Sequence, residues 1–339
     1  MRQLDLMVSK IFKRILYGLL VIVILIILWL IIPRTWSALN PGKPPLGYYS
    51  IPFTYLAARV GLEELVNLEP EVPQVIEEIK DIEYKKIKDK SLQLDIYRPK
   101  EPGTLPPLLV FIHGGSWKSG KRSDYMVYLI DFAKRGYITA TVSYRLLRDG
   151  PYPACIEDIK DAVDWLFRNG ETYGYDTSRI ALIGGSAGAH LALLAAYGWG
   201  NSNELADSIV MPENIHRVKA VVDIYGPTDL TTEYARNHPL VTSFLAHSYE
   251  EAPWIFQEAS PVHYLDKDDP PTLILQGTAD RLVPAVQSDQ LKKMLDELGV
   301  PCIYYRLPGW PHTMDIVQRV NDFCQLKMNE FFEQYLNYN

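Results

Sequence analysis

The feature that most constrains this chain is an uncharged apolar run of 18 residues, Ile15–Ile32. As a helix the run would span about 27 Å, close to the roughly 30 Å hydrocarbon core of a bilayer. It is apolar on every side, which disfavours a buried helix with one polar face. A cleaved signal peptide is the competing interpretation, but its apolar region is usually about 7–15 residues long and ends at small residues. This run is longer and stops at Pro33-Arg34-Thr35-Trp36, so we predict an uncleaved transmembrane signal anchor over residues 15–32.

The charges around the run predict its orientation. Residues 1–34 hold five basic residues against one acid, and Lys10, Lys13 and Arg14 directly precede the run. Positively charged flanks of a membrane span stay in the cytoplasm. We therefore expect residues 1–14 to form a cytoplasmic N-terminal tail, with the rest of the chain outside the cytoplasm and held at the lipid bilayer.

The remainder of the chain is acidic, with 29 basic residues against 40 acidic ones. This balance argues against nucleic acid as a partner, because phosphate binding needs a basic face. The three cysteines, Cys155, Cys302 and Cys324, are too few for a disulfide scaffold and match no zinc spacing. We interpret them as small buried hydrophobes, with a Cys302–Cys324 bridge left open.

Seven prolines fall between residues 33 and 73, which excludes one long helix over that stretch. We predict a proline-rich linker over residues 33–79. Its apolar piece, Tyr55–Val66, is expected to form a short helix that rests either on the following domain or on the lipid surface.

Eight short apolar segments beyond about residue 80 are typical of strands. They are Ile82–Ile87, Leu92–Tyr97, Leu108–Ile112, Tyr137–Ser143, Ile180–Ile183, Val218–Ile224, Thr272–Leu275 and Cys302–Leu307. Helical periodicity separates the later segments, over Cys155–Phe167, Ala187–Ala196, Val286–Leu298 and Met314–Tyr335. An adjacent strand pair followed by this alternation predicts an α/β domain over residues 80–339. Its eight-stranded sheet should be mostly parallel, flanked by helices, with an antiparallel edge.

Residues 226–262 interrupt the alternation between the sixth and seventh strands, and we expect a cap-like insert there. The insert is rich in aromatic residues: Tyr234, Phe244, Tyr249, Trp254 and Phe256. These side chains would either line a pocket for a short acyl or aromatic group or pack into the core. The insert and the loop over residues 116–125 should both border the site, since ligands of α/β sheets bind beyond the carboxyl ends of the strands.

The motif Gly184-Gly185-Ser186-Ala187-Gly188 follows a predicted strand and opens a predicted helix. In that setting G-x-S-x-G is a nucleophile elbow, whose glycines allow the sharp turn that exposes the serine hydroxyl. A second motif, His113-Gly114-Gly115-Ser116-Trp117, also follows a strand. An acyl-transfer site needs two backbone N–H groups aimed at the oxyanion. We assign the oxyanion hole to Gly114 or Gly115 together with Ala187, and expect His113 to order its own loop.

A serine nucleophile needs a base that is itself oriented by an acid. In the chain order Ser, acid, His, the base should follow the last strand, where His312 lies, and the acid should follow the preceding strand, where Asp280 lies. Asp223 and Asp229 are the fallback acids. Among the other histidines after Ser186, His190 is expected to be structural, and the rest lie in or near the insert.

Five blocks in chain order carry a family resemblance: HGGSWKSGKRSDY, PACIEDIKDAVDWL, YGYDTSRIALIGGSAGAHLALLAA, LILQGTADRLVP and LPGWPHTM. Together they resemble the α/β-hydrolase fold. They are most similar to its bacterial feruloyl and acetylxylan esterase-like branch, beside the hormone-sensitive-lipase-like carboxylesterases. The resemblance covers about residues 80–335.

The resemblance implies Ser186 as nucleophile, Asp280 as acid, His312 as base, and Gly114 and Gly115 as oxyanion glycines, in agreement with the positional argument. Two departures stand out. Ser116 replaces a third glycine that many relatives have, and Thr313 replaces the glycine that often follows the catalytic histidine.

These features predict a membrane-anchored serine hydrolase that cleaves small carboxylic esters, with short-acyl or aromatic groups, and requires no metal or organic cofactor. The elbow is also similar to kynurenine formamidases and membrane-bound prenylcysteine methylesterases, so formamide and prenyl-ester substrates stay open. A non-catalytic binding module is disfavoured by the complete set of catalytic residue types. A prolyl-oligopeptidase-type peptidase is disfavoured because such peptidases usually carry a propeller domain, for which this sequence leaves no room. A metallohydrolase is disfavoured because no H-E-x-x-H motif is present.

Overall fold

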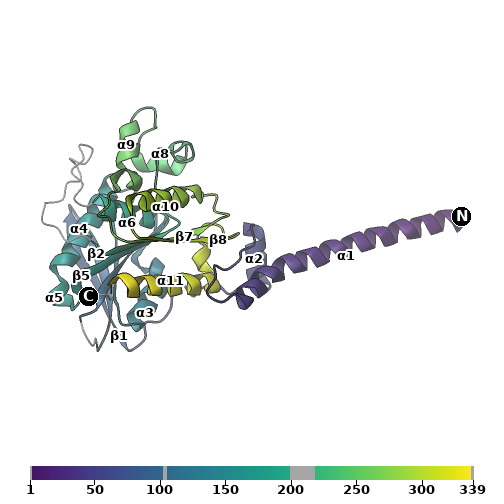
Figure 1. Ribbon diagram of the computed structural model, residues 1–339, viewed down its shortest axis with the longest axis horizontal. Coiled ribbons are helices and arrows are strands. Elements are labelled where there is room, and N and C mark those ends of the chain that lie inside the picture. Colours follow the sequence, from purple (N-terminus) through teal and green to yellow (C-terminus); the bar gives the residue numbers. More distant parts are fainter. Residues whose placement is uncertain (1, 102–104, 199–217, 337–339) are drawn as a thin grey trace.

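The computed structural model describes residues 2–101, 105–198 and 218–336, with side chains from residue 10 onward (Figure 1). Eight strands form one sheet in the order β1-β2-β4-β3-β5-β6-β7-β8. They are β1 (Ile76–Ile87), β2 (Lys90–Pro99), β3 (Pro107–Ile112), β4 (Ile138–Val142), β5 (Asp176–Gly185), β6 (Ala220–Ile224), β7 (Thr272–Gly277) and β8 (Cys302–Leu307). Strand β2 pairs antiparallel with β1 and β4, and the other neighbours are parallel. The predicted mostly parallel sheet with an antiparallel edge is confirmed.

Helices cover both faces of the sheet, which is why its central strands are apolar throughout. Along β3, Leu108 and Val110 pack on one face, and Leu109 and Phe111 pack on the other. The first face carries α4 (Ala154–Arg168), α6 (Ala187–Tyr197) and α10 (Val286–Leu298). The opposite face carries α3 (Met126–Lys134) and α11 (Gln318–Leu336). A short helix, α5 (Gly170–Tyr173), precedes β5. Residues at the carboxyl ends of the parallel strands therefore meet along one edge.

Helix α1 (Arg2–Leu39) extends away from the domain (Figure 1). From Lys10 to Leu39 it is long and apolar enough to cross a membrane, and only 6% of its most apolar window is buried. The helix continues through Pro33, although the sequence predicted its end at Ile32. Proline removes one intrahelical hydrogen bond, and contacts with later parts of the chain hold the helix on both sides of it. Trp29 Nε1 donates to the Tyr48 carbonyl at 3.2 Å, and Arg319 Nη1 donates to Ser37 Oγ at 2.8 Å.

The short helix of the proline-rich segment is α2 (Ile51–Arg59), so its predicted bounds, Tyr55–Val66, are wrong. It begins earlier because Pro52 in its first turn has the backbone angle that a helix start requires. It ends near Gly61, whose φ of +75° breaks the helical path.

Residues 45–68, which we call the strap, pack against the domain. The Gly47 and Tyr49 N–H groups donate to the Pro308 and Gly309 carbonyls at 2.6 and 2.9 Å. Farther along, Leu65 forms a β-bridge with Val317. The same bridge explains why the predicted helix Met314–Tyr335 is divided. A 3₁₀ turn over Met314–Ile316 and α11 are separated by Val317, which has extended backbone.

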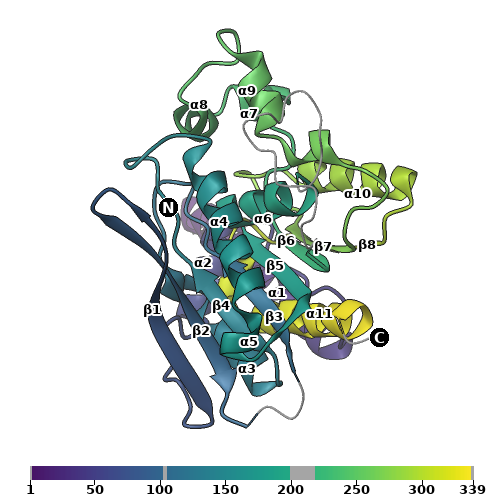
Figure 2. The ribbon, with the colours of Figure 1, turned by 90° about the vertical axis from the view of Figure 1, so that its left-hand side faces the viewer.

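The insert between β6 and β7 contains α7 (Glu233–Arg236), α8 (Pro239–Leu245), α9 (Pro253–Glu258) and a 3₁₀ helix over Pro261–Tyr264. Helices α7, α8 and α9 gather at one end of the domain (Figure 2). Phe244 and Phe256 are fully buried in the core, whereas Trp254 is exposed. Of the insert's aromatic residues, Tyr234 lines a cavity beside Ser186. The sequence left open whether these aromatic side chains pack into the core or line a pocket. The structure shows both: Phe244 and Phe256 pack into the core, and Tyr234 lines a cavity.

The three cysteines are free. Cys155 and Cys324 are buried, as expected of small hydrophobes. Cys302 packs against the sheet face that carries α4, whereas Cys324 belongs to the core on the opposite face. The Cys302–Cys324 bridge that the sequence left open is therefore not formed.

Candidate active site

Ser186 occupies a sharp turn between β5 and α6. Its φ of +56° and ψ of −123° lie outside the regions that non-glycine residues favour, which is strain of the kind that functional turns store. Small residues make the turn possible. A Cβ on Gly184 would overlap the backbone of Gly188, and a Cβ on Gly188 would overlap the Ile112 carbonyl of the neighbouring strand. The sequence places glycine where strand, turn and helix approach most closely.

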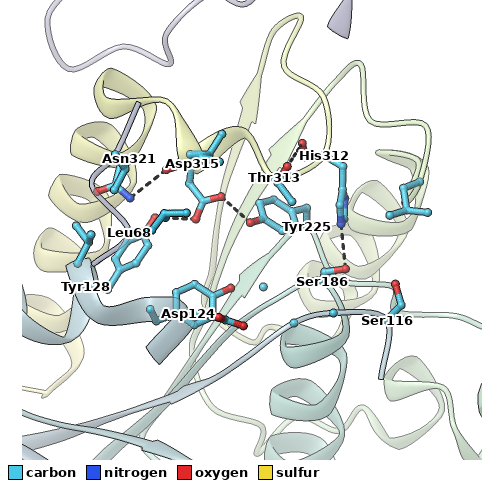
Figure 3. A pocket seen from close by; sticks show the side chains of 18 residues that line it. Leu68, Ser116, Asp124, Tyr128, Ser186, Tyr225, His312, Thr313, Asp315 and Asn321 are labelled. Carbon is cyan, nitrogen blue, oxygen red and sulfur yellow. Dashed lines mark hydrogen bonds between the residues drawn. The ribbon is translucent and has the colours of Figure 1, made fainter. Parts of the chain in front are cut away.

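The three residues predicted as nucleophile, base and acid form one hydrogen-bonded chain, whose Ser186–His312 bond is drawn in Figure 3. His312 Nε2 lies 2.9 Å from Ser186 Oγ, and His312 Nδ1 lies 2.6 Å from Asp280 Oδ2. A carboxylate accepts hydrogen bonds, so the imidazole donates through Nδ1–H and its Nε2 is left to accept the serine proton. The Asp280 side chain is fully buried, and 14% of the His312 side chain is exposed.

Backbone groups hold the acid in place. Asp280 Oδ1 accepts from the N–H groups of Leu282 and Val283 at 2.8 and 2.9 Å. Gln276 Nε2 donates to Oδ2 at 3.3 Å. With both oxygens occupied, the carboxylate cannot turn away from the imidazole.

Two glycines of the 113–117 loop lie against the serine turn. A Cβ on Gly114 would lie 2.7 Å from the Gly185 carbonyl, and Gly115 has a φ of +104°. The backbone N–H groups of Gly115 and Ala187 donate no hydrogen bond within the described part of the chain. Gly115 lines the cavity beside Ser186, and Ala187 follows the serine directly. Both amides are therefore available to a ligand.

The two departures from the family pattern have the backbone conformation that glycine favours. Ser116 has a φ of +54°, and Thr313, next to His312, has a φ of +55°. A side chain in this left-handed region costs roughly 1–2 kcal/mol. Thr313 Oγ1 donates to the His312 carbonyl at 2.7 Å, which ties it to the residue it follows.

His113 is buried beneath the loop. Its ring stacks on Tyr144 with centroids 4.3 Å apart, and Tyr144 Oη donates to the His113 carbonyl at 2.8 Å. His113 Nδ1 lies 2.9 Å from the Gly114 carbonyl. Burial lowers the pKa of His113, so the neutral ring is favoured. These contacts anchor the loop that carries the two glycines.

The other candidate bases have different partners. His190 is fully buried, its Nε2 lies 2.7 Å from the Ala259 carbonyl, and burial lowers its pKa to about 4. His238 caps α8, while His247 and His263 are exposed. His216 lies outside the described residues.

The fallback acids also have other partners. Asp229 Oδ1 accepts from the backbone N–H and hydroxyl of Thr231. Asp223 Oδ1 accepts from the Gly226 N–H at 2.7 Å, and its Oδ2 has no hydrogen-bond partner among the described residues. Burial raises the pKa of Asp223 to about 7. Asp280 is thus the predicted acid that meets His312.

Asp223 gives a pH-dependence that unfolding can measure. Its folded pKa lies above the ordinary carboxyl value of about 4, so between pH 4 and 7 the folded protein binds more protons than the unfolded chain. Its contribution to the free energy of unfolding should fall by up to about 1.4 kcal/mol per pH unit as pH rises through that window. In Asp223→Asn, urea unfolding should show a smaller loss of stability between pH 5 and pH 7. An unchanged difference between the two pH values would contradict this assignment.

Two cavities meet at Ser186. The larger, about 360 Å³, lies on the His312 side and is bordered by Thr313, Asp315 and the strap residues Val66 and Leu68. The smaller, about 30 Å³, lies on the insert side. Its lining includes Trp117, Ala187, Tyr234, Val241 and Leu282. Both the 116–125 loop and the insert therefore border the site, as expected. Within the described residues no cluster of three or more His, Cys, Asp or Glu could hold a metal ion.

A buried polar network in the larger cavity was missed by sequence reasoning (Figure 3). Asp315 accepts hydrogen bonds from Tyr225 Oη at 2.5 Å and from Tyr128 Oη at 3.0 Å. The Tyr225 ring packs against His312, with centroids 4.6 Å apart. Burial raises the pKa of Asp315. Its position three residues after His312 was the one signal that could have drawn attention to it.

Residues 94–295 match the family model described as BD-FAE. Among curated proteins, the chain is 34% identical over 237 residues to Esterase LipQ of Mycobacterium tuberculosis. That alignment covers 67% of this chain and 55% of LipQ, so the chain spans about half the length of this curated relative.

Solved structures of similar fold include a truncated form of a carbohydrate esterase from gut microbiota, with a TM-score of 0.66 and 25% identity. That match covers 77% of this chain and 97% of the esterase. Esterase 2 of Thermogutta terrifontis with propionate bound has a TM-score of 0.63 and 25% identity, over 79% of this chain and 97% of its own.

Proposed function

Because this chain belongs to the BD-FAE family of α/β-hydrolase esterases, we propose that it is a membrane-anchored serine hydrolase of carboxylic esters. The observation that carries the proposal is the hydrogen-bonded chain Ser186–His312–Asp280 beside the Gly115 and Ala187 amides, which donate no hydrogen bond to any described residue. The related proteins named above are esterases, which supports the same reaction class.

In the proposed reaction, Ser186 Oγ attacks the ester carbonyl while His312 Nε2 takes its proton. Asp280 holds the Nδ1–H tautomer and stabilises the imidazolium that forms. The N–H groups of Ala187 and of Gly114 or Gly115 bind the oxyanion. His312 then returns the proton to the leaving alcohol, and a water attacks the acyl-enzyme by the same steps in reverse order.

The proton transfer from His312 to the leaving alcohol indicates which cavity holds the alcohol and which holds the acyl group. The alcohol oxygen must leave within reach of His312, so the alcohol occupies the larger cavity that His312 lines. The acyl group then extends into the smaller cavity on the insert side.

A fluorophosphonate probe tests the hydrolase itself, because it phosphonylates an activated serine with loss of fluoride. We expect the full-length protein to be labelled at Ser186 and Ser186→Ala to stay unlabelled. Absence of labelling in the folded protein would favour a hydrolase-fold binding module that lacks catalysis.

The small acyl cavity predicts a preference for acetyl to hexanoyl esters over palmitoyl esters. A cavity of about 30 Å³ bordered by Trp117 and Tyr234 leaves little space for a long chain. We expect kcat/KM across a 4-nitrophenyl ester series, kept below substrate aggregation limits, to fall beyond C6. A steady rise towards C16 would overturn this assignment.

A formamidase is the second candidate, because the same cavity would accept a formyl group. Comparing the hydrolysis of N-formyl-4-nitroaniline with that of 4-nitrophenyl acetate, which release an amine and an alcohol of similar shape, distinguishes the two activities. A prenylcysteine methylesterase is disfavoured, since its large acyl portion would have to enter the smaller cavity.

The exposed apolar surface of α1 supports membrane anchoring, and the basic residues before it support a cytoplasmic N-terminus with an extracytoplasmic catalytic domain. Protease added outside intact cells should digest the domain and leave a short N-terminal stub. Protection of the domain on cells whose surface is accessible would place it in the cytoplasm. A soluble product beginning near residue 40 would instead establish a cleaved signal peptide.

A further inference from the structure

The edge of the sheet that carries the site lies on the side where α1 leaves the domain (Figure 1). Directly after β8, Pro308 and Gly309 accept hydrogen bonds from Gly47 and Tyr49, which lie eight and ten residues beyond the end of α1. His312 follows in the same loop. The carboxyl ends of the parallel strands, and the cavities at them, therefore lie next to the membrane-proximal part of the chain.

A buried ionic clamp fixes the strap to this loop. Glu63 accepts from Arg319 Nη2 at 2.7 Å and from Tyr48 Oη at 2.5 Å. Arg319 also lies 4.7 Å above the Trp310 ring, and Trp310 Nε1 donates to the Pro45 carbonyl at 2.8 Å. The Glu63 side chain is 1% exposed and the Arg319 side chain 17%, so the pair is largely shielded from water. The strap is a fixed wall of the site.

The strap supplies the apolar rim of the larger cavity. Val66 N–H donates to the Ile316 carbonyl at 2.9 Å, which holds Val66 and Leu68 against the cavity. Leu68 is 52% exposed and lies beside the Tyr128 and Asp315 side chains (Figure 3). Ile316, which also lines this cavity, is exposed as well. The mouth of the larger cavity is thus bordered by apolar side chains in contact with solvent.

Helix α2 of the strap also exposes apolar side chains. Ile51, Tyr55 and Leu56 are exposed on α2, which carries one charged residue, Arg59. The α2 residue Phe53 contacts Trp29 of α1, with ring centroids 6.3 Å apart. A short apolar helix beside the end of a membrane span has the character of an interfacial element.

We propose that the larger cavity receives the long apolar alcohol of a membrane-partitioned ester directly from the bilayer surface beside α1. This inference rests on the proposed function and names its substrate class: a short acyl group esterified to a long apolar alcohol. Water enters the reaction only in the hydrolysis of the acyl-enzyme. The alcohol released by His312 returns to the bilayer, while the short acid leaves into water.

An isomeric pair of esters tests this substrate class in the full-length protein reconstituted in phosphatidylcholine vesicles. Hexadecyl acetate and ethyl hexadecanoate have the same formula and a similar affinity for lipid, but the long chain lies on opposite sides of the ester. We expect hexadecyl acetate to be hydrolysed at least about tenfold faster. Equal rates, or faster hydrolysis of ethyl hexadecanoate, would overturn the inference.

The rim is tested by Leu68→Asp, with Leu105→Asp as its matched control. Leu105 is similarly exposed, at 56%, but precedes β3 at the opposite edge of the sheet. Leu68→Asp should lower hydrolysis of hexadecyl acetate at least about tenfold more than hydrolysis of propyl acetate, because the long alcohol has the larger apolar contact with the rim. Leu105→Asp should change neither rate. An equal effect of Leu68→Asp on both esters, or none on either, would contradict the proposed rim.

Direct entry from the bilayer is tested by placing hexadecyl acetate either in the vesicles that hold the protein or in separate protein-free vesicles. Hydrolysis should be fast in the first case and slow in the second. Equal rates would show entry through water and overturn the inference. Hydrolysis of propyl acetate alone would also overturn it while leaving the proposed function intact. Hydrolysis of none of these esters would reject the proposed function and this inference together.

Discussion

Replacing Ser186 by alanine should lower kcat/KM for 4-nitrophenyl acetate by roughly 10⁵- to 10⁶-fold, and His312→Ala should have a similar effect. The hydroxyl is the only group in the hydrogen-bonded chain that can form the acyl-enzyme, and it is a poor nucleophile until His312 Nε2, 2.9 Å away, takes its proton. Because each residue acts only with the other, the double variant should be little worse than either single one. Initial-rate measurements with purified full-length variants provide the test.

The matched control for the base is His263→Ala. His263 is an exposed histidine of the 3₁₀ helix after α9, so its loss should leave the rate within about twofold. Far-ultraviolet circular dichroism should show the same fold in all these variants. Near-normal activity of His312→Ala combined with loss in His263→Ala would show that the base is misassigned.

Asp280→Asn should cost about 10⁴-fold in kcat, although the change is isosteric. The carboxylate accepts the Nδ1–H of His312 at 2.6 Å, which leaves Nε2 free to accept the serine proton. An asparagine would present an N–H to Nδ1 in one orientation, which favours the opposite tautomer, and it would no longer stabilise the imidazolium. The Leu282 and Val283 N–H groups would donate to the asparagine oxygen, which favours the orientation with the amide N–H towards His312 Nδ1.

Asp229→Asn is the control for the acid. Asp229 is a largely buried aspartate whose described partners include Thr231 and Gln290. Measured as kcat at saturating substrate, this variant should lose little. If Asp229→Asn lost as much activity as Asp280→Asn, the assignment of a single acid would be wrong.

The sequence was informative wherever a local pattern has one structural solution. The apolar run Leu108–Ile112 is too short and too uniformly apolar for a surface helix, and it forms the buried strand β3. Likewise, glycines on both sides of Ser186, between a strand and a helix, permit few conformations other than the tight turn observed. The order of Ser186, Asp280 and His312 along the chain then follows from which strand ends lie near one another.

The strap could not be predicted in this way, because its role depends on contacts between residues far apart in the chain. Glu63 and Arg319 are 256 positions apart, and neither belongs to a motif. Prolines between residues 33 and 73 correctly excluded one long helix, but they carry no information on what the remaining backbone contacts. Asp315 was missed for a similar reason: its importance comes from Tyr128 and Tyr225, which the sheet brings to it.

The clamp between strap and domain has a practical consequence for producing a soluble enzyme. The region that matches the family model, residues 94–295, contains neither His312 nor the strap, and a shortened protein beginning at β1 would lack the strap as well. The protein shortened to begin at β1 would uncover Trp310. It would also leave Arg319 without Glu63, the carboxylate that neutralises it. Deletion of the hydrophobic helix should instead end near residue 40, so that Pro45 and Glu63 are retained. The hydrophobic helix is therefore separable from the domain only between α1 and the strap.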